Sequence, residues 1–232
     1  MPDLQGFGYM LAEGTLITLQ VALLSTVFGV AIGIAVAMMK LSSSRFARLA
    51  GDVYTTLVRG VPALVFILLI YFGGVRLVNE IGHAFGHDQH IDINAFVAGV
   101  FALSLAFGAY ATEVFRGAFQ SLPRGQIEAA RALGMGRWLT FRRVSLPQVW
   151  RIALPGLGNI FLVILKETAL VSVIGLEELM RKTEYAVGFT RQPFTFFLCA
   201  AFIYLGLTII SMLALQMMER RAARGFTPVE AA

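Results

Sequence analysis

Five long apolar stretches most constrain how this chain of 232 residues can fold. Each is long enough to cross roughly 30 Å of hydrocarbon as a helix that rises about 1.5 Å per residue. Backbone polar groups find no water in lipid, so a spanning segment must satisfy them within its own helix. The expected spans are approximately residues 15–39, 61–78, 94–115, 153–173 and 194–217. The sequence therefore predicts an all-α integral membrane protein.

Composition supports this fold class. Only 14% of the residues are charged and 57% are hydrophobic, whereas a soluble domain carries about 25% charged residues. The single cysteine, Cys199, can form neither an intrachain disulfide nor a cysteine-based metal site. The expected surroundings of the chain are therefore a lipid bilayer.

Positive charge is distributed unevenly between the two sides that the spans define. If the N-terminus lies outside, the inside segments are 40–60, 116–152 and the tail after 217. These segments hold fourteen of the nineteen Lys and Arg residues. Cytoplasmic loops carry the excess of Lys and Arg, so the sequence predicts the N-terminus outside and the C-terminus inside. The net charge of +5 then reflects membrane sidedness, and no nucleic-acid partner is expected.

Two spans carry residues that affect helix packing. Gly29 and Gly33 in the first span are four residues apart, a spacing that lets two helices approach closely. Packing inside the subunit is the preferred interpretation, with a dimer seam as the alternative. The fourth span contains Pro155 and, near its far end, Lys166 and Glu167, which fits a broken or cavity-lining helix.

The long inside segment 116–152 has its own internal structure. Pro123 is expected to start a short helix and Gly134 to end it. A second short helix, with Trp138 on one side, is expected to end at Pro147. Two short amphipathic helices joined by a glycine turn make a knob that can transmit a push from a soluble partner.

A spaced motif lies within this segment. Glu128-Ala129-Ala130 is followed after three residues by Gly134 and, nine residues later, by Val144-Ser145-Leu146-Pro147. This pattern resembles the EAA loop of bacterial ABC-importer permeases, whose last block is Ile-x-Leu-Pro. Val144 departs from that pattern but is also β-branched. The resemblance implies the type I permease fold and assigns ATPase coupling to Glu128, Ala129, Ala130, Gly134, Leu146 and Pro147.

The resemblance covers essentially the whole chain. Stretches 54–62, 108–117 and 166–175 look like polar amino acid permeases, most closely the Q-type subunit of histidine, lysine, arginine and ornithine importers or of opine importers. It implies one transmembrane domain over residues 1–232 in the bacterial inner membrane, with a periplasmic N-terminus and a cytoplasmic C-terminus. The partners it implies are two ATPase subunits, a second permease subunit and a periplasmic amino-acid-binding protein.

ATP use is expected to reside in a partner. None of the three lysines, Lys40, Lys166 and Lys182, lies in the Gly-Lys-Ser/Thr sequence that cradles phosphate. The chain is therefore expected not to be an enzyme and to hold no cofactor or metal of its own, with ATP and Mg²⁺ bound by the ATPase.

Charges within spans are costly and often functional. Glu113 lies three residues before Arg116, so an ion pair is expected, with contact to a cationic cargo as the alternative. For Lys166 and Glu167, a paired structural role and a place along the translocation route remain open. Beyond the fourth span, Glu177 and Glu178 are expected at a solvated surface or binding-protein contact, with an acidic entrance for cargo as the alternative.

One histidine-rich segment raises the question of a metal site. His83, His87, Asp88 and His90 lie between the second and third spans. Gly82 and Gly86 argue against the helix that would align His83 with His87, so a polar outer loop is expected.

Other functions stay open as alternatives. Glutamine, glutamate or cystine could replace a basic amino acid as cargo within the same class. An ion-coupled secondary transporter would need an inverted repeat of spans, which five spans do not readily provide. A membrane enzyme would need convergent acid, base or metal groups, which the sequence does not present.

Overall fold

The computed structural model describes residues 6–86 and 91–223, which form helices joined by short connections. Five long apolar helical segments confirm the predicted all-α fold with five candidate membrane spans. The long helices are α1 (Gly8–Lys40), α3 (Ala63–Ala84), α4 (Ala95–Gln120), α7 (Leu146–Glu167) and α9 (Pro193–Ala222). The shorter ones are α2 (Arg45–Gly60), α5 (Arg124–Ala132), α6 (Arg137–Thr140) and α8 (Leu179–Thr190).

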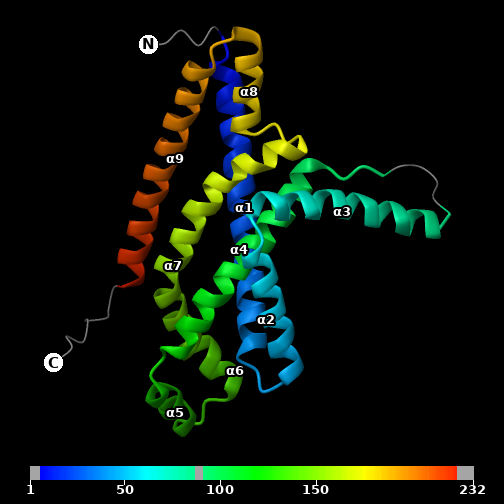
Figure 1. Cartoon of the computed structure of the whole chain (residues 1–232). Helices are drawn as coiled ribbons and strands as arrows, with labels where there is room; N and C mark the ends of the chain where they lie inside the picture. The colour runs from blue at the N-terminus through cyan, green and yellow to red at the C-terminus, as the bar shows by residue number, and fades with distance from the viewer. Residues whose placement is uncertain (1–5, 87–90, 224–232) are drawn as a thin grey trace.

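The helix α4 forms the centre of the fold. It packs along α1 on one side and α7 on the other, while α9 lies against α7 (Figure 1). Within its most apolar stretch 67% of the residues are buried, and Phe107 and Phe115 are among the largest fully buried side chains. This burial agrees with the contacts that α4 makes with α1, α2, α3 and α7.

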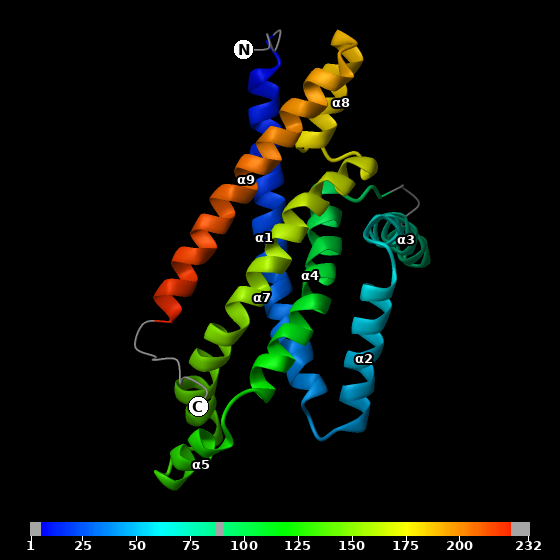
Figure 2. The same cartoon turned by 60° about the vertical axis from the view of Figure 1, so that its left-hand side comes forward.

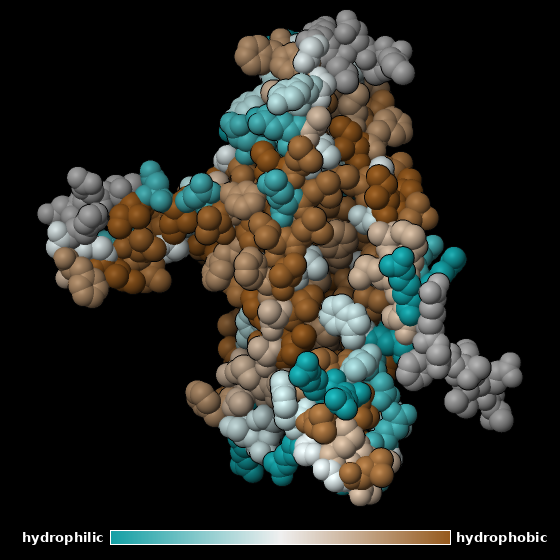
Figure 3. All heavy atoms as spheres, turned by 180° about the vertical axis from the view of Figure 1, so that it is seen from behind, coloured by the Kyte–Doolittle hydropathy of each residue, from teal (hydrophilic) through white to brown (hydrophobic). Residues whose placement is uncertain are grey.

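Different helices lie at the two ends of the molecule. The N-terminal end of α1 lies beside α8, and the short helices α5 and α6 lie at the opposite end, which we call the coupling end (Figure 1). Seen from behind, the middle of the molecule is predominantly hydrophobic, and hydrophilic residues gather toward both ends (Figure 3). This distribution is the one expected of a chain that crosses a bilayer.

The contact between α1 and α4 depends on small residues. A Cβ atom placed on Gly29 would lie 2.7 Å from Cβ of Phe107, and one on Gly33 would lie 2.7 Å from Cβ of Ala111. Both distances are shorter than two carbon atoms tolerate. The glycine pair therefore serves packing inside the subunit, the preferred interpretation of its spacing.

The helix α3 lies transverse to this bundle. It projects sideways in Figure 1 and is seen end-on in Figure 2. Only 6% of its most apolar stretch is buried within the chain. Its apolar surface is therefore available to lipid or to another membrane-embedded chain.

The segment after the first span is more regular than expected. Residues 45–60 form α2, which runs back along α1 and α4. Ser44 caps its start, because the Ser44 hydroxyl accepts a hydrogen bond from the backbone N–H of Ala47. The sequence analysis predicted only an inside segment here, from its basic residues.

The fourth span also differs from its expected form. Pro147 lies in the first turn of α7 and does not end the helix before it, because a proline there costs no intrahelical hydrogen bond. A single π-helical turn, Phe141–Ser145, joins α6 to α7. The helix continues through Pro155 and tightens into a 3₁₀ segment, Thr168–Ile174, before Gly175 turns the chain with φ of 91°.

Candidate functional site: a polar network and a coupling knob

A network of charges fastens three helices near the coupling end. The Lys40 Nζ atom, at the end of α1, lies 2.6 Å from a carboxylate oxygen of Glu113 on α4 and 2.8 Å from one of Asp52 on α2. It also donates a hydrogen bond to the Thr55 hydroxyl at 3.0 Å. Lys40 is 11% exposed, so this cation is shielded from water and compensated by two carboxylates.

Glu113 also holds the start of the coupling segment. Its second carboxylate oxygen accepts a hydrogen bond from Arg116 Nε at 2.9 Å, which is the expected i,i+3 ion pair. Glu113 therefore joins α1 and α2 to the last turns of α4. Sequence reasoning found the Arg116 partner but missed Lys40, because 73 residues separate the two positions.

Two polar cavities lie next to this network. The first has a volume of about 440 Å³ and is lined by Lys40, Thr55, Thr56, Arg59, Gly60, Tyr110 and Glu113. The second, about 240 Å³, lies farther along α4, and its lining includes Pro62, Phe66, Ala106 and Glu167. Arg59, Gly60 and Tyr110 belong to both linings. These cavities bring together residues from α2, α4 and α7 that are far apart in the sequence.

Lys166 and Glu167 are neighbours in sequence but have different surroundings. Glu167 is partly buried and faces the second cavity, whereas Lys166 is exposed. Among the described residues no ion pair joins the two or links either of them to a third group. The geometry therefore favours a cavity-lining position for Glu167 over a paired structural one.

Gly134 terminates α5, the first helix of the knob at the coupling end. Gly134 has φ of +78°, its N–H bonds to the Arg131 carbonyl, and the Met135 N–H bonds to the Ala130 carbonyl. This pair of bonds is the Schellman arrangement, which favours glycine because other residues are strained at positive φ. The glycine of the motif thus fixes the turn between α5 and α6.

Most residues of the motif are accessible at this end. Glu128, Ala129, Gly134 and Pro147 are exposed, Leu146 is partly exposed, and Ala130 is buried. Two large apolar side chains stand beside them, Leu133 at 83% exposure and Trp138 at 70%. Exposed apolar groups on a polar end of a membrane protein are typical of a surface that a partner covers.

An aromatic contact connects this surface to the central helix. The ring of Trp138 stacks on Phe141 with centroids 5.7 Å apart, and Phe141 stacks on Phe119 of α4 at 6.2 Å. The π-helical turn places Phe141 between them. The knob therefore contacts α4 through packed rings and is joined to α7 by the π-helical turn.

At the other end, a buried carboxylate joins α1, α8 and α9. Glu178 caps α8 by accepting from the Arg181 N–H, and it also accepts hydrogen bonds from Thr18 and Tyr204 hydroxyls. Burial raises the pKa of its carboxyl. Glu178 is fully buried, so it is neither at a solvated surface nor part of an entrance.

Its neighbour Glu177 is on the surface, as expected. The Lys182 ammonium lies 2.9 Å from Glu177 and 3.3 Å from Glu13. The hydrogen bond from Lys182 lowers the pKa of the Glu177 carboxyl. This pair ties the start of α8 to α1.

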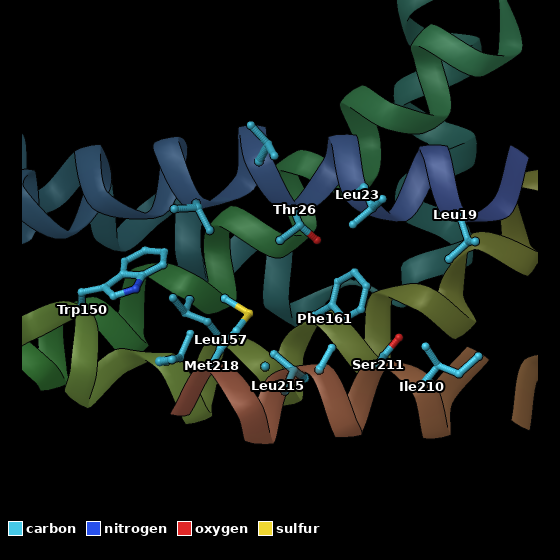
Figure 4. Close-up of a pocket in the computed structure, with 15 residues that line it drawn as sticks. Leu19, Leu23, Thr26, Trp150, Leu157, Phe161, Ile210, Ser211, Leu215 and Met218 are labelled. Atoms are coloured by element: carbon cyan, nitrogen blue, oxygen red, sulfur yellow. The ribbon is translucent and has the colours of Figure 1, made fainter. Parts of the chain in front are cut away.

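A third, apolar cavity of about 360 Å³ lies between α1, α7 and α9. Leu19, Leu23, Phe161 and Leu215 are among the side chains that point into it from all three helices (Figure 4). It offers almost no hydrogen-bonding groups, so it does not suit a polar solute.

Within residues 6–86 and 91–223 no group of three or more metal-ligating side chains occurs. His83 is exposed near the end of α3, and His87, Asp88 and His90 lie outside the described residues.

Apolar helices of membrane-spanning length, polar cavities between them and an exposed knob at one end are the features of a multi-pass membrane transport subunit. Residues 29–224 match the family model of the binding-protein-dependent transport system inner membrane component, and the chain belongs to this family. The confirmed function is that of an inner-membrane permease subunit, a component of a transporter and not an enzyme.

Curated relatives include permeases for opines and basic amino acids. The nopaline transport system permease protein NocQ of Agrobacterium fabrum is 48% identical over 95% of this chain and 94% of its own. The histidine/lysine/arginine/ornithine transport system permease protein HisQ of Escherichia coli is 46% identical over 96% of this chain and 97% of its own.

Solved structures agree with the fold. A crystal structure of an amino acid ABC transporter with histidines has a TM-score of 0.76 and 38% identity, covering 91% of this chain and 94% of that one. An inward-facing methionine ABC transporter, MetNI, has a TM-score of 0.77 at 18% identity and covers 97% of this chain, which supports the fold alone.

Proposed function

We propose that this chain is one of two permease subunits in an ABC importer for cationic amino acids, and that residues 1–232 act as one transmembrane domain. The observation that carries the proposal is the exposed knob, where motif residues stand beside the uncovered Leu133 and Trp138. A knob of this kind needs a soluble partner, and the family depends on one. The partner is an ATPase subunit, which binds both ATP and Mg²⁺.

Coupling in this proposal runs from the knob into the membrane. Closure of two ATPase subunits displaces α5 and α6, and the displacement reaches α4 through the stacked rings and α7 through the π-helical turn. The network of Lys40, Asp52 and Glu113 carries it on to α1 and α2. The helices then rock between outward and inward access to the polar cavities.

The second permease subunit covers surface that this chain leaves open. The helix α3 is apolar, transverse and nearly unburied, and Lys166 on α7 is exposed. A charged side chain on a membrane span is costly when it faces lipid. A second subunit, identical or paralogous, would turn this face into the wall of a shared route.

The orientation follows from charge and from the knob. An ATPase works in the cytoplasm, so the coupling end is cytoplasmic and the start of α1 is periplasmic. The basic residues of α2 and of segment 116–152 then lie inside, in agreement with the distribution of Lys and Arg. The periplasmic binding protein docks at the end formed by α1 and α8.

The cargo is inferred from the relatives and from Glu167. Those relatives are named for histidine, lysine, arginine, ornithine and opines. Glu167 lines the second cavity and forms no ion pair within the described part of this chain. We assign it to the cargo route, where it favours a cationic amino acid over glutamine, glutamate or cystine.

The test is affinity purification of the tagged chain in mild detergent, with mass spectrometry of the proteins that co-elute. An ATPase subunit should accompany the wild type and be lost from Glu128→Arg combined with Gly134→Pro. Glu80→Gln, on the exposed face of α3, serves as the matched control and should retain it. A chain that purifies alone and transports without ATP would overturn the proposal in favour of an ion-coupled transporter.

A further inference from the structure

A cation from the chain itself occupies the boundary between the two polar cavities. The Arg59 guanidinium carbon lies 5.2 Å from the centroid of the Tyr110 ring. Arg59 comes from the last turn of α2 and Tyr110 from α4. Both residues line the first cavity and also the second. The guanidinium and the ring therefore stand where a solute passing from one cavity to the other would have to go.

The two sides of this boundary each present a carboxylate. Glu113 lines the first cavity, where Lys40 and Arg116 engage it, and Glu167 lines the second. Between them, the face of Tyr110 is the next group able to attract positive charge, because an aromatic ring carries negative potential on its faces. Carboxylate, ring and carboxylate thus form a sequence of weak cation-attracting positions along α4 and α7.

We propose that the Tyr110 ring is a cation-binding subsite on the cargo route, which Arg59 fills while the two cavities are separated and which the guanidinium or ammonium group of the cargo fills as it passes. This rests on the proposed function in that it assumes this route carries cargo. The Arg59 side chain is then an internal competitor of the cargo, and its displacement opens the boundary.

The local structure lets the side chain move without the helix. The Tyr54 hydroxyl donates a hydrogen bond to the Leu105 carbonyl at 2.7 Å, so α2 is fastened to α4 little more than one turn before Arg59. Arg59 itself is exposed, and Gly60 after it has open space around it. A change of Arg59 rotamer therefore suffices to uncover the ring of Tyr110, a residue that is 40% exposed with the guanidinium in place.

The proposal makes an unusual prediction about competition. Arginine and citrulline have nearly the same shape, but only arginine carries a guanidinium cation. Removal of Arg59 as a competitor should strengthen arginine binding and leave citrulline binding nearly unchanged. The gain should vanish when the ring is removed as well, which separates competition for Tyr110 from a general loss of positive charge.

The experiment measures equilibrium binding of radiolabelled L-arginine and L-citrulline to the detergent-purified permease–ATPase complex without binding protein. Arg59→Gln should tighten arginine binding by about tenfold, the scale of a partly desolvated cation–π contact. Arg59→Gln with Tyr110→Leu should lose that gain, and Tyr110→Phe in the same background should restore it. The matched control adds Phe101→Leu, which removes an exposed α4 ring outside both cavities, and should keep the gain.

Two results would overturn the subsite. One is unchanged or weaker arginine binding in Arg59→Gln, and the other is an equal gain for arginine and citrulline. The amount of ATPase that co-purifies with each variant establishes assembly. Failure of the proposed function is recognised separately, as a wild-type chain that retains no ATPase or a reconstituted complex that takes up no arginine with ATP.

Discussion

The Lys40 ammonium lies 2.6 Å from the Glu113 carboxylate, and this contact fastens the end of α1 to the part of α4 that leads into the coupling segment. The lysine is the last residue of α1 and the glutamate lies in the penultimate turn of α4. Because Glu113 also binds Arg116, one carboxylate serves both the packing of the bundle and the orientation of the knob.

Loss of either partner should destabilise the chain. Lys40→Met leaves Glu113 with Arg116 alone, and Glu113→Gln leaves Lys40 with Asp52 as its remaining carboxylate. Because each variant removes the 2.6 Å contact, we expect a cost of about 2 kcal/mol, intermediate between exposed and fully buried pairs. The melting temperature in detergent, followed by tryptophan fluorescence, should fall by roughly 5 °C. The double variant should lose less than the sum of the two single losses.

The control for this pair is Arg76→Gln. Arg76 bonds to Glu80 on the surface of α3 and is 81% exposed, so its removal should change the melting temperature little. Additive losses for Lys40→Met and Glu113→Gln would show that the two side chains are not energetically coupled.

The glycine contact between α1 and α4 should not tolerate side chains. Gly33→Val forces atoms into Ala111, and we expect a loss of about 1–3 kcal/mol from overpacking. Gly73→Ala on α3 is the matched control, since nothing lies within 4 Å of its added methyl group. The comparison uses the fraction of monodisperse protein and its melting temperature, and equal behaviour of the two variants would refute the packing role.

Stability should depend on pH through Glu178. Burial raises the pKa of this carboxyl in the folded state, so its contribution is full below the unfolded value of about 4.3 and is lost as pH rises through the folded value. In Glu178→Gln the side chain stays neutral, so this variant does not lose stability through ionisation at position 178. Its melting temperature relative to wild type should therefore rise as the pH increases from the unfolded value through the higher folded value.

Glu80→Gln provides the baseline for that titration, because Glu80 is exposed on α3. A difference between Glu178→Gln and wild type that stays flat across the pH range would contradict the role of burial at Glu178.

The turn at Gly134 should be needed for coupling more than for folding. Gly134→Val places a β-branched residue at φ of +78°, which strains the connection between α5 and α6 by roughly 1–3 kcal/mol. We expect the variant to insert and purify normally. The amount of amino acid that it transports per ATP hydrolysed should be at least tenfold lower than in the wild type. Gly125→Val is the control, since Gly125 is exposed on α5 with open space around it.

The sequence predicted those parts of the fold that local patterns determine. Apolar length gave the five spans, Gly29 and Gly33 indicated a close helix contact, and Gly134 indicated the end of a short helix. Each signal reflects a constraint that acts within one segment or one face of a helix, so a single sequence displays it.

Contacts between distant segments could not be predicted in the same way. Lys40 with Glu113 and Arg59 with Tyr110 bring together side chains that are 73 and 51 residues apart. The packing of α1 against α4 brings the first pair together, and the packing of α2 against α4 brings the second pair together. Glu178 was placed at the surface because it follows a span next to another glutamate, and its burial depends on the position of α9.

ATP-driven import is tested most directly by arginine uptake into proteoliposomes that contain this chain, its second permease subunit and the ATPase, with binding protein and arginine outside. We expect uptake that requires enclosed ATP and the binding protein and that disappears in Glu128→Arg. Uptake by this chain without ATP, driven by an ion gradient and unaffected by Glu128→Arg, would contradict this expectation.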